Sequence, residues 1–232
     1  MITLDQYAYN IRNIARAGQS SSNSEILTIK QIQFWINGYR AKGMLEITDN
    51  GKQIDPTLVQ DLGVVPLEEV DAADSQCPPI EWGCKVKKVT IPKIMSFPDL
   101  RALTYVGKIN KIDSFTVNHP DVVNYKKETK YGQLISRAYL VGNNLYFMLT
   151  KNDEDIEYVN IRGVFEDPTE VFSFATSGCV SACYDPAKDA YPMPLALYDY
   201  VTTNILTKEL GMSLKTVTDE LSNARQDNEP IR

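Results

Sequence analysis

The chain has 232 residues, of which 43% are hydrophobic, so it can bury the core of one ordinary domain or of two small ones. Its net charge of −6 argues against generic adhesion to nucleic acid or to an anionic membrane, because both depend on clustered lysine and arginine. No apolar run reaches the roughly 18 to 20 residues of a membrane span and no signal peptide is recognisable, so we expect synthesis in the cytoplasm and no membrane partner.

A pair of antiparallel helices is predicted at the start of the chain. Thr3 and Gln6 form a capping box before an apolar stripe, which predicts a first helix over residues 4–17. A second apolar stripe predicts a helix over residues 25–42, with Gly43 as its stop. The short connection between the two stripes favours an antiparallel arrangement.

The middle of the chain changes to short apolar segments punctuated by proline, glycine and asparagine, which is typical of antiparallel β structure. The clearest hairpin turns at Gly142, Asn143 and Asn144, residue types that tolerate a positive φ. The predicted fold class is therefore α+β, with an N-terminal helical pair, a central antiparallel β region and a C-terminal helix. Strands are predicted at residues 64–67, 86–91, 103–109, 133–141, 145–150 and 158–165.

A C-terminal helix is predicted after Pro192 and Pro194, which favour an extended entry and a clean helix start. Leu195 opens its apolar stripe, which resumes at helical spacing beyond Gly211, next to a polar stretch that offers little to cover it. An apolar face of this kind needs a partner surface, within the chain or outside it. The residues predicted to bind a partner are Tyr198, Leu206, Leu214, Val217 and Leu221. The three predicted segments of the chain are residues 1–43, 44–173 and 174–232.

Charge is concentrated in two adjacent blocks of opposite sign. Residues 43–83 hold nine carboxylates and one lysine, a net charge of −8, whereas residues 84–111 hold seven basic residues and one aspartate, a net charge of +6. The blocks can pair within one subunit, or between neighbouring subunits, where complementary potentials fix the register. The residues predicted for pairing between subunits are Lys85, Lys87, Lys88, Glu68, Glu69 and Asp71.

No catalytic or metal-binding pattern is recognisable. Acid–base and nucleophilic mechanisms need a poised base, and the single histidine, His119, stands in a turn-like segment before a proline. Cys77, Cys84, Cys179 and Cys183 lack the C-x2-C spacing of structural zinc motifs, so we expect reduced, metal-free thiols. We therefore predict that the protein is not an enzyme, with no catalytic residue, no metal and no cofactor.

Four stretches stand in order along nearly the whole chain: IKQIQFWINGYRAKGM, CPPIEWGCKVKKVTIPKI, IRGVFEDPTEV and YPMPLALYDYVTTNILTKELGMS. Together they resemble the head-to-tail connector, or ring, proteins of crAss-like bacteriophages. Those proteins are similar in role to the adaptor or tail tubular proteins of short-tailed phages. No single stretch among the four is a catalytic motif.

The resemblance implies a structural virion protein that forms a homo-oligomeric ring of about twelve copies below the portal and helps to build the DNA channel. The implied partners are the portal protein and the adjacent ring or tail proteins, with DNA passing through the channel without specific binding. The implied location is the head–tail junction of the virion, after synthesis in the cytoplasm of the bacterial host.

Two other functions stay open from the residues alone. A monomeric virion module that recognises carbohydrate would expose aromatic rings on one sheet face, and Tyr139, Tyr146 and Tyr158 are the residues for it. A metal-binding domain would need the cysteines or carboxylates to converge in the fold.

Overall fold

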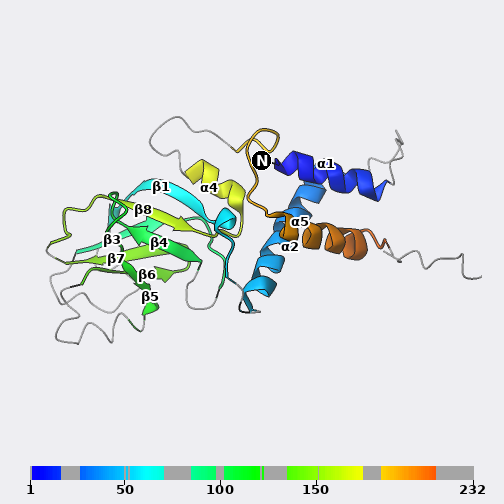
Figure 1. Ribbon diagram of the computed structural model, residues 1–232. Coiled ribbons are helices and arrows are strands. Elements are labelled where there is room, and N and C mark those ends of the chain that lie inside the picture. Colours follow the sequence, from blue (N-terminus) through cyan, green and yellow to red (C-terminus); the bar gives the residue numbers. More distant parts are fainter. Residues whose placement is uncertain are drawn as a thin grey trace, which may run out of the picture.

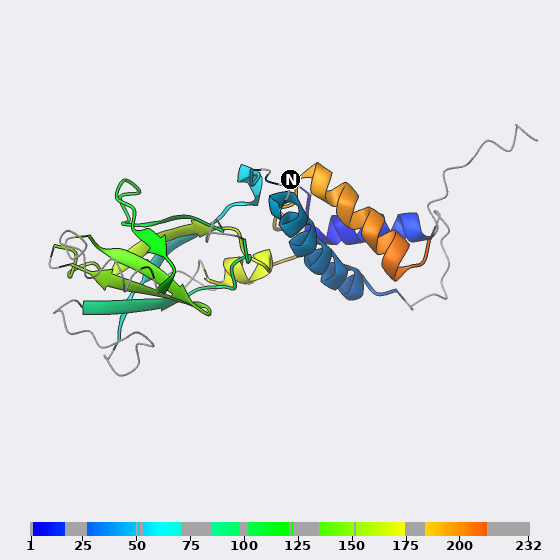
Figure 2. The same ribbon diagram turned by 90° about the horizontal axis from the view of Figure 1, so that it is seen from below.

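The computed structural model describes residues 2–16, 27–49, 51, 53–70, 85–97, 102–120, 122, 135–150, 152–174 and 184–212. Three helices lie at one end of an elongated molecule and two β-sheets lie at the other (Figure 1, Figure 2). We call these two parts the helical region and the β region. The helical region contains α1 (Leu4–Ala15), α2 (Ile29–Asp49) and α5 (Leu195–Asn204), which continues into the π-helical segment η4 (Ile205–Glu209).

Helix α1 begins as its sequence predicts. The Thr3 side chain accepts a hydrogen bond from the Gln6 amide at 3.3 Å, and the Gln6 side chain accepts one from the Thr3 amide at 3.1 Å. This reciprocal capping satisfies two amides that have no partner within the helix. The buried face of α1 carries Leu4, Tyr7, Ala8 and Ile11, at the spacing of one helical stripe.

Helix α2 continues through Gly43 to Asp49, so the predicted stop at Gly43 is wrong. A β-carbon at Gly43 would lie 2.7 Å from Leu197 and 2.8 Å from Tyr200, both on α5. Glycine at this position lets two helices approach closely, rather than ending one of them. The predicted start, at residue 25, lies outside the described residues.

Helix α5 begins after Pro194 and packs on both other helices of the region. Its first residue, Leu195, is 72% exposed, and Leu197 is buried in its place, so the predicted stripe was out of phase at this end. Ile205 and Leu206, at the start of the π-helical turn η4, are both buried, as the predicted stripe has them. The predicted three-segment division stays a prediction, and its first and last segments contribute to one apolar core.

The β region consists of a three-stranded sheet, in the order β1–β8–β4, and a five-stranded sheet, in the order β2–β3–β7–β6–β5. Among the described strands every pairing is antiparallel except that of β5 with β6, which is parallel, so the prediction of a purely antiparallel region was wrong there. The α+β fold class is confirmed. The strands are β1 (Gln60–Pro66), β2 (Glu68–Glu69), β3 (Lys85–Thr90), β4 (Leu103–Gly107), β5 (Thr116–Asn118), β6 (Arg137–Val141), β7 (Asn144–Leu149) and β8 (Tyr158–Gly163), with a 3₁₀ turn η1 (Pro56–Leu58) and a helix α4 (Pro168–Phe174).

The six predicted strands are confirmed with shifted ends. Strand β1 begins four residues before its prediction, because a bulge between Asp61 and Val64, with Gly63 at a φ of 74°, interrupts the alternation of apolar side chains. The hairpin of β6 and β7 turns at Gly142, with a φ of 61°, as expected. Strands β2 and β5 were not predicted, since two and three residues are too few to show a period of two.

The two sheets pack face to face around an apolar core. Leu62, Val159 and Ile161 contribute to it from the three-stranded sheet, and Leu145 and Phe147 contribute from the five-stranded sheet. All five side chains are almost inaccessible to solvent. The β region is therefore a sandwich with a core of its own, and the core of the helical region reaches the end of this sandwich through Met95, Phe97, Ala102 and Val164.

The helical and β regions meet around Arg40 of α2. Its side chain is fully buried, and it donates from Nε to the Pro192 carbonyl at 3.0 Å and from Nη1 to the Phe165 carbonyl at 3.2 Å. Its guanidinium carbon lies 5.7 Å from the centre of the Tyr191 ring. Burial lowers the pKa of Arg40 from its ordinary value. Arg40 thus joins α2 to the end of the β region and to the segment that leads into α5.

Candidate assembly surfaces

The residues predicted to bind a partner divide into two groups. Tyr198 is half-buried, with its ring centre 4.8 Å from that of Tyr7, and Leu206 lies in the core of the helical region. Leu214, Val217 and Leu221 lie outside the described residues. Within the described chain, Tyr198 and Leu206 therefore pack against α1 and α2, and partner binding by this group of five stays a prediction.

The two charged blocks meet within one subunit at strands β2 and β3. Glu68 lies opposite Lys88 and Glu69 lies opposite Lys87 in the antiparallel register. Lys87 is only 5% exposed, and its ammonium donates to the Glu154 carbonyl at 3.0 Å and to the Ile156 carbonyl at 2.8 Å.

These contacts separate the two neighbouring lysines. Lys87 is committed to its own subunit, whereas Lys88 is half-buried on the opposite face of β3. The side chain of Lys85 and the whole of Asp71 lie outside the described residues. Pairing of the blocks between subunits stays a prediction, and Lys88, Glu68 and Glu69 are the described residues through which it can be tested.

The three tyrosines considered for carbohydrate recognition do not form an exposed platform. Tyr139 and Tyr146 are buried and stack on each other across β6 and β7, with ring centres 5.2 Å apart and planes 8° from parallel. Tyr158 is 46% exposed and belongs to the other sheet. The prediction that these rings share one accessible face was wrong, because the first two pack as an aromatic pair within their own subunit.

The described part of the chain shows no group of three or more His, Cys, Asp or Glu side chains that could hold a metal ion. All four cysteines lie outside that part, so their predicted state stays a prediction. His119 is exposed, directly after strand β5. None of the helices in the described ranges combines the length and the apolar character that crossing a bilayer requires.

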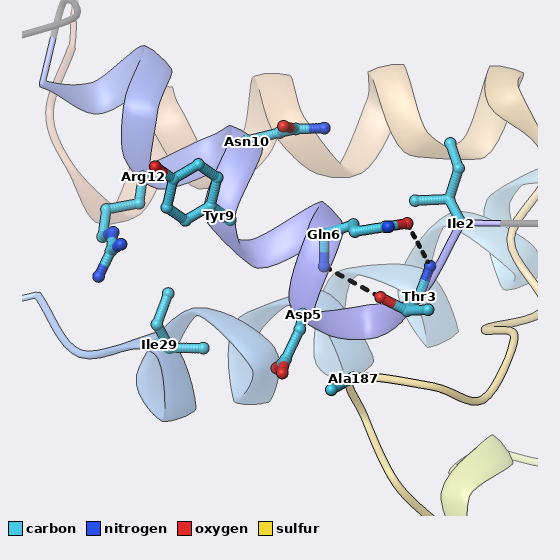
Figure 3. Close-up of a pocket in the computed structure, with 9 residues that line it drawn as sticks. All are labelled: Ile2, Thr3, Asp5, Gln6, Tyr9, Asn10, Arg12, Ile29 and Ala187. Carbon is cyan, nitrogen blue, oxygen red and sulfur yellow. Dashed lines mark hydrogen bonds between the residues drawn. The ribbon is translucent and has the colours of Figure 1, made fainter.

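A groove of about 560 Å³ lies between α1 and the start of α2 (Figure 3). We call it the α1 groove. Tyr9 is 51% exposed, and the guanidinium of Arg12 lies 5.1 Å from the centre of its ring. Figure 3 shows these two side chains next to each other on α1, on the side of the helix that faces Ile29 of α2. The nine residues that line the groove are Ile2, Thr3, Asp5, Gln6, Tyr9, Asn10, Arg12, Ile29 and Ala187.

Three of the polar side chains that line the groove have partners within the subunit, whereas the buried Nε of Arg12, which also lines it, has no hydrogen-bond partner among the described residues. Thr3 and Gln6 bond to each other in the capping box, and the Asp5 carboxylate accepts a hydrogen bond from the side chain of Gln33 on α2. The groove therefore combines the apolar surfaces of Ile2, Tyr9 and Ile29 with the polar side chains of Asn10 and Arg12. A lining of this kind suits a ligand that joins an apolar part to a polar one.

A protruding loop in the β region carries the most exposed apolar side chain of the described chain. The loop spans residues 108–113, between β4 and β5, and we call it the Ile112 loop. Ile112 is 83% exposed and Ile109 is 50% exposed. Single exposed apolar residues are common on protein surfaces, but two at the tip of one loop form a local apolar patch.

Hydrogen bonds hold the backbone of the Ile112 loop in one shape. The Asn110 side chain accepts from the amide of Ile112 at 3.0 Å and from that of Asp113 at 3.3 Å. The Tyr105 hydroxyl contacts the Lys108 carbonyl at 3.1 Å and the Asp113 carbonyl at 3.0 Å. The bonds accepted by Asn110 define an Asx turn, whereas the bonds of the Tyr105 hydroxyl tie the loop to strand β4.

Two carboxylates anchor the loop to the sheets beneath it. Lys108 lies 2.8 Å from Asp153, and Lys111 lies 3.3 Å from Asp61. Burial would raise the pKa of each aspartate, but hydrogen bonds outweigh it, chiefly from the Gly63 amide to Asp61 and from Lys108 to Asp153, and the net result is a lowered pKa for both. Hydrogen bonding to Asp153 in turn raises the pKa of Lys108. Both aspartates are consequently charged at neutral pH, and the ion pairs remain in place.

Neither the groove nor the loop was identified from the sequence. The groove arises from the way α1 lies on α2, which no local pattern encodes. The loop had a weak local signal, in the form of Asn110 flanked by Ile109 and Ile112, since a turn residue between two isoleucines is unusual for a solvated turn.

Comparison with known proteins places the whole chain in one family. Residues 6–228 match the profile of the family described as phage tail ring protein 2, of crAss-like phages. A search of curated proteins finds no match. Because the matched range covers nearly the full chain, the chain belongs to the phage tail ring protein 2 family and is a structural ring protein of a crAss-like phage tail.

Proposed function

We propose that this protein is the repeating subunit of a ring in the head-to-tail connector, below the portal, where it forms part of the wall of the DNA channel. The observation that carries the proposal is the match of residues 6–228 to a tail ring family. On this proposal the protein is a building element of the virion without catalytic turnover. It is made in the cytoplasm of the host bacterium and then incorporated at the head–tail junction.

Ring formation requires each subunit to expose two different surfaces that fit one another. The described chain offers exposed apolar side chains in both of its regions, including Tyr9 in the helical region and Ile112 in the β region. Contact between such surfaces would remove them from water, at about 25 cal/mol for each Å² of apolar area. These side chains support an assembling protein more than a solitary one.

The net charge of −6 also suits a channel wall. DNA has to slide past the wall during ejection, and a basic lining would hold it through its phosphates. We propose that DNA passes without specific binding and that the partners are copies of this chain, the portal and the adjacent ring or tail proteins.

The stretch beyond Gly211, with Leu214, Val217 and Leu221, is proposed as a docking element for the portal or an adjoining ring. Ending the chain after Gly211 should lower the melting temperature of the isolated protein only modestly, because it removes Met212, which packs partly buried against the core, while Leu206 and the other buried core residues remain. The same truncation should abolish incorporation into the particle. A truncated protein that is incorporated normally would remove the docking role.

Native mass spectrometry of the protein bound to its portal tests the proposed function. We expect a single species with about twelve copies of this chain, the number that the resemblance to connector ring proteins implies. A portal complex that carries one copy, or a chain that stays monomeric in the presence of portal, would contradict the proposal.

A further inference from the structure

The α1 groove contains a cation that lacks a hydrogen-bond acceptor. Arg12 is half-buried, and its Nε is buried without a hydrogen-bond partner among the described residues. Its guanidinium carbon instead lies 5.1 Å from the centre of the Tyr9 ring. A buried donor without an acceptor destabilises a folded protein, so a native structure that keeps one calls for an explanation.

The carboxylate in the lining of the groove does not serve Arg12. Asp5 accepts a hydrogen bond from Gln33 of α2 and precedes Arg12 by about two turns of α1. Figure 3 shows Arg12 at the end of the groove near Ile29, whereas Asp5 lies nearer to Ala187. The acceptor for Arg12 therefore has to come from outside the described part of the subunit.

The surroundings of Arg12 define the chemistry of that acceptor. A carboxylate suits a guanidinium best, because two parallel hydrogen bonds can form to Nε and to one Nη. The groove has a volume of about 560 Å³, and the rings and methyl groups of Tyr9, Ile2 and Ile29 form its apolar walls. The expected occupant therefore presents a carboxylate next to an apolar side chain.

Many other cations of the described chain are committed to their own subunit. The buried side chains of Arg40 and Lys87 donate to backbone carbonyls. Ion pairs with carboxylates are formed by Lys93, Lys108, Lys111, Arg162 and Lys188. Arg12 differs from these cations, because its contact within the subunit is with an aromatic ring.

The charge of the chain indicates where the carboxylate comes from. A ring protein stands beside copies of itself, and each copy of this chain carries 30 acidic residues against 24 basic ones. Neighbouring copies with a net charge of −6 repel each other unless cations at their interface meet carboxylates. A second copy thus supplies the acidic groups, and the α1 groove supplies a cation that is available to them.

From these observations we infer that the α1 groove is part of the interface between neighbouring subunits, where Arg12 of one copy binds a carboxylate that the next copy presents beside an apolar side chain. The inference rests on the proposed function, since a ring places a second copy against each subunit. It adds to that function a specific polar contact that fixes how the two copies meet.

Photo-crosslinking of the full-length chain tests the inference. A benzophenone amino acid replaces Asn10, which is exposed and lines the groove, and the protein is assembled on its purified portal complex and irradiated. We expect a covalent dimer of this chain, joined close to an Asp or Glu that stands beside an apolar residue. Hydrocinnamate, which joins a carboxylate to an apolar ring, should suppress the crosslink at millimolar concentration, whereas its uncharged amide should not.

A double-mutant cycle then tests the pairing itself. Arg12→Gln should lower incorporation at least tenfold, or about 1.4 kcal/mol per interface, and Arg12→Lys should lower it less because the charge remains. Replacing the crosslinked carboxylate with its amide should cause a similar loss, and the double variant should lose no more than either single one. The melting temperature of isolated Arg12→Gln should stay within about 2 °C of the wild-type value. Lys30→Gln is the control, because it makes the same charge change on α2 outside the lining.

The outcomes separate the inference from the proposed ring. A multimer in native mass spectrometry whose crosslinks from position 10 stay within one copy, or reach another protein, would overturn the inference and leave the ring in place. Normal incorporation of Arg12→Gln, additive losses in the double variant, or equal suppression by the amide would overturn it as well. The absence of any multimer of the wild-type chain would instead contradict the proposed function.

Discussion

The helical region and the β region expose apolar side chains by different physical means. In the helical region, the groove is a consequence of how two amphipathic helices pack, and its shape depends on apolar contacts. In the β region, the Ile112 loop is held by hydrogen bonds and ion pairs whose polar groups all lie within one subunit. We therefore expect substitutions that change apolar packing to alter the α1 groove. Substitutions of polar groups and changes in pH should alter the Ile112 loop.

The largest effect should come from the joint between the two regions. Replacing Arg40 with alanine removes the donor for the Pro192 and Phe165 carbonyls and leaves a cavity, at a cost of about 3 to 5 kcal/mol in the free energy of unfolding. Denaturant unfolding measures this loss, with Lys30→Ala on the exposed side of α2 as the control. A loss below about 1 kcal/mol would show that the contact between the helical and β regions does not depend on Arg40.

The next largest effect should arise inside the β region. Lys87→Ala leaves the Glu154 and Ile156 carbonyls without their donor, which we expect to cost about 1 to 3 kcal/mol of unfolding free energy. The neighbouring change Lys88→Ala should stay within about 0.5 kcal/mol. If Lys88→Glu then weakens ring assembly in a salt-sensitive way, the predicted charge pairing between subunits is supported. Equal losses of unfolding free energy for both alanine variants would show that the hydrogen bonds of Lys87 do not stabilise the β region specifically.

A pair of glycines in α2 tests the packing account of the helical region. Gly43→Ala places a methyl group 2.7 Å from Leu197, and we expect a loss of about 1 to 2 kcal/mol. Gly38→Ala meets no atom within 4 Å and should stabilise the protein by up to about 1 kcal/mol through helix propensity. Melting curves of the two variants provide the measurement, and a stabilised Gly43→Ala would show that α2 and α5 are not in close contact.

The smallest effect should be a pH dependence of the Ile112 loop and of the β1–β8 contacts that Asp61 also makes, with Gly63, Asn160 and Arg162. The pKa of Asp61 is lower in the folded protein than its value of about 3.9 in the unfolded chain. Ionised Asp61 therefore stabilises the folded protein above about pH 3.9, and this stabilisation is lost as the pH falls through the folded-state pKa. Hydrogen exchange at the Ile112 amide should therefore accelerate as the pH falls below about 4, relative to the amides of the β7 strand. The variant Asp61→Asn should show faster exchange at neutral pH and a smaller step, since the ion pair of Lys108 with Asp153 remains. An unchanged rate in the wild-type protein would contradict the role of Asp61.

Periodic patterns predicted most of the secondary structure, because burial on one face is recorded along the chain. The limits appear where one residue type serves two purposes. Glycine ends some helices and permits close helix–helix contact in others. The sequence therefore predicted a helix end at Gly43, where the structure shows close contact with α5. The alternation of β3 could not distinguish Lys87 from Lys88, because Lys87 is in phase with the buried Val89 and Lys88 is in phase with the equally buried Val86.

The assembly surfaces could not be predicted in the same way. Exposure of Ile112 follows from the bonds of Asn110 and Tyr105, which join residues whose positions depend on two sheets. The α1 groove depends on the distance between two helices and on Ala187, which is far away in sequence. What the chain does was recognised through its family resemblance, because ring proteins carry no catalytic motif.

The most direct test of the central claim is a cryo-EM reconstruction of the head–tail junction of the virion at a resolution that traces side chains. We predict a closed ring of this chain below the portal, with its wall around the DNA path and with each subunit in contact with two identical neighbours. A junction without this chain, or with this chain present as isolated copies on the outside of the tail, would contradict the account.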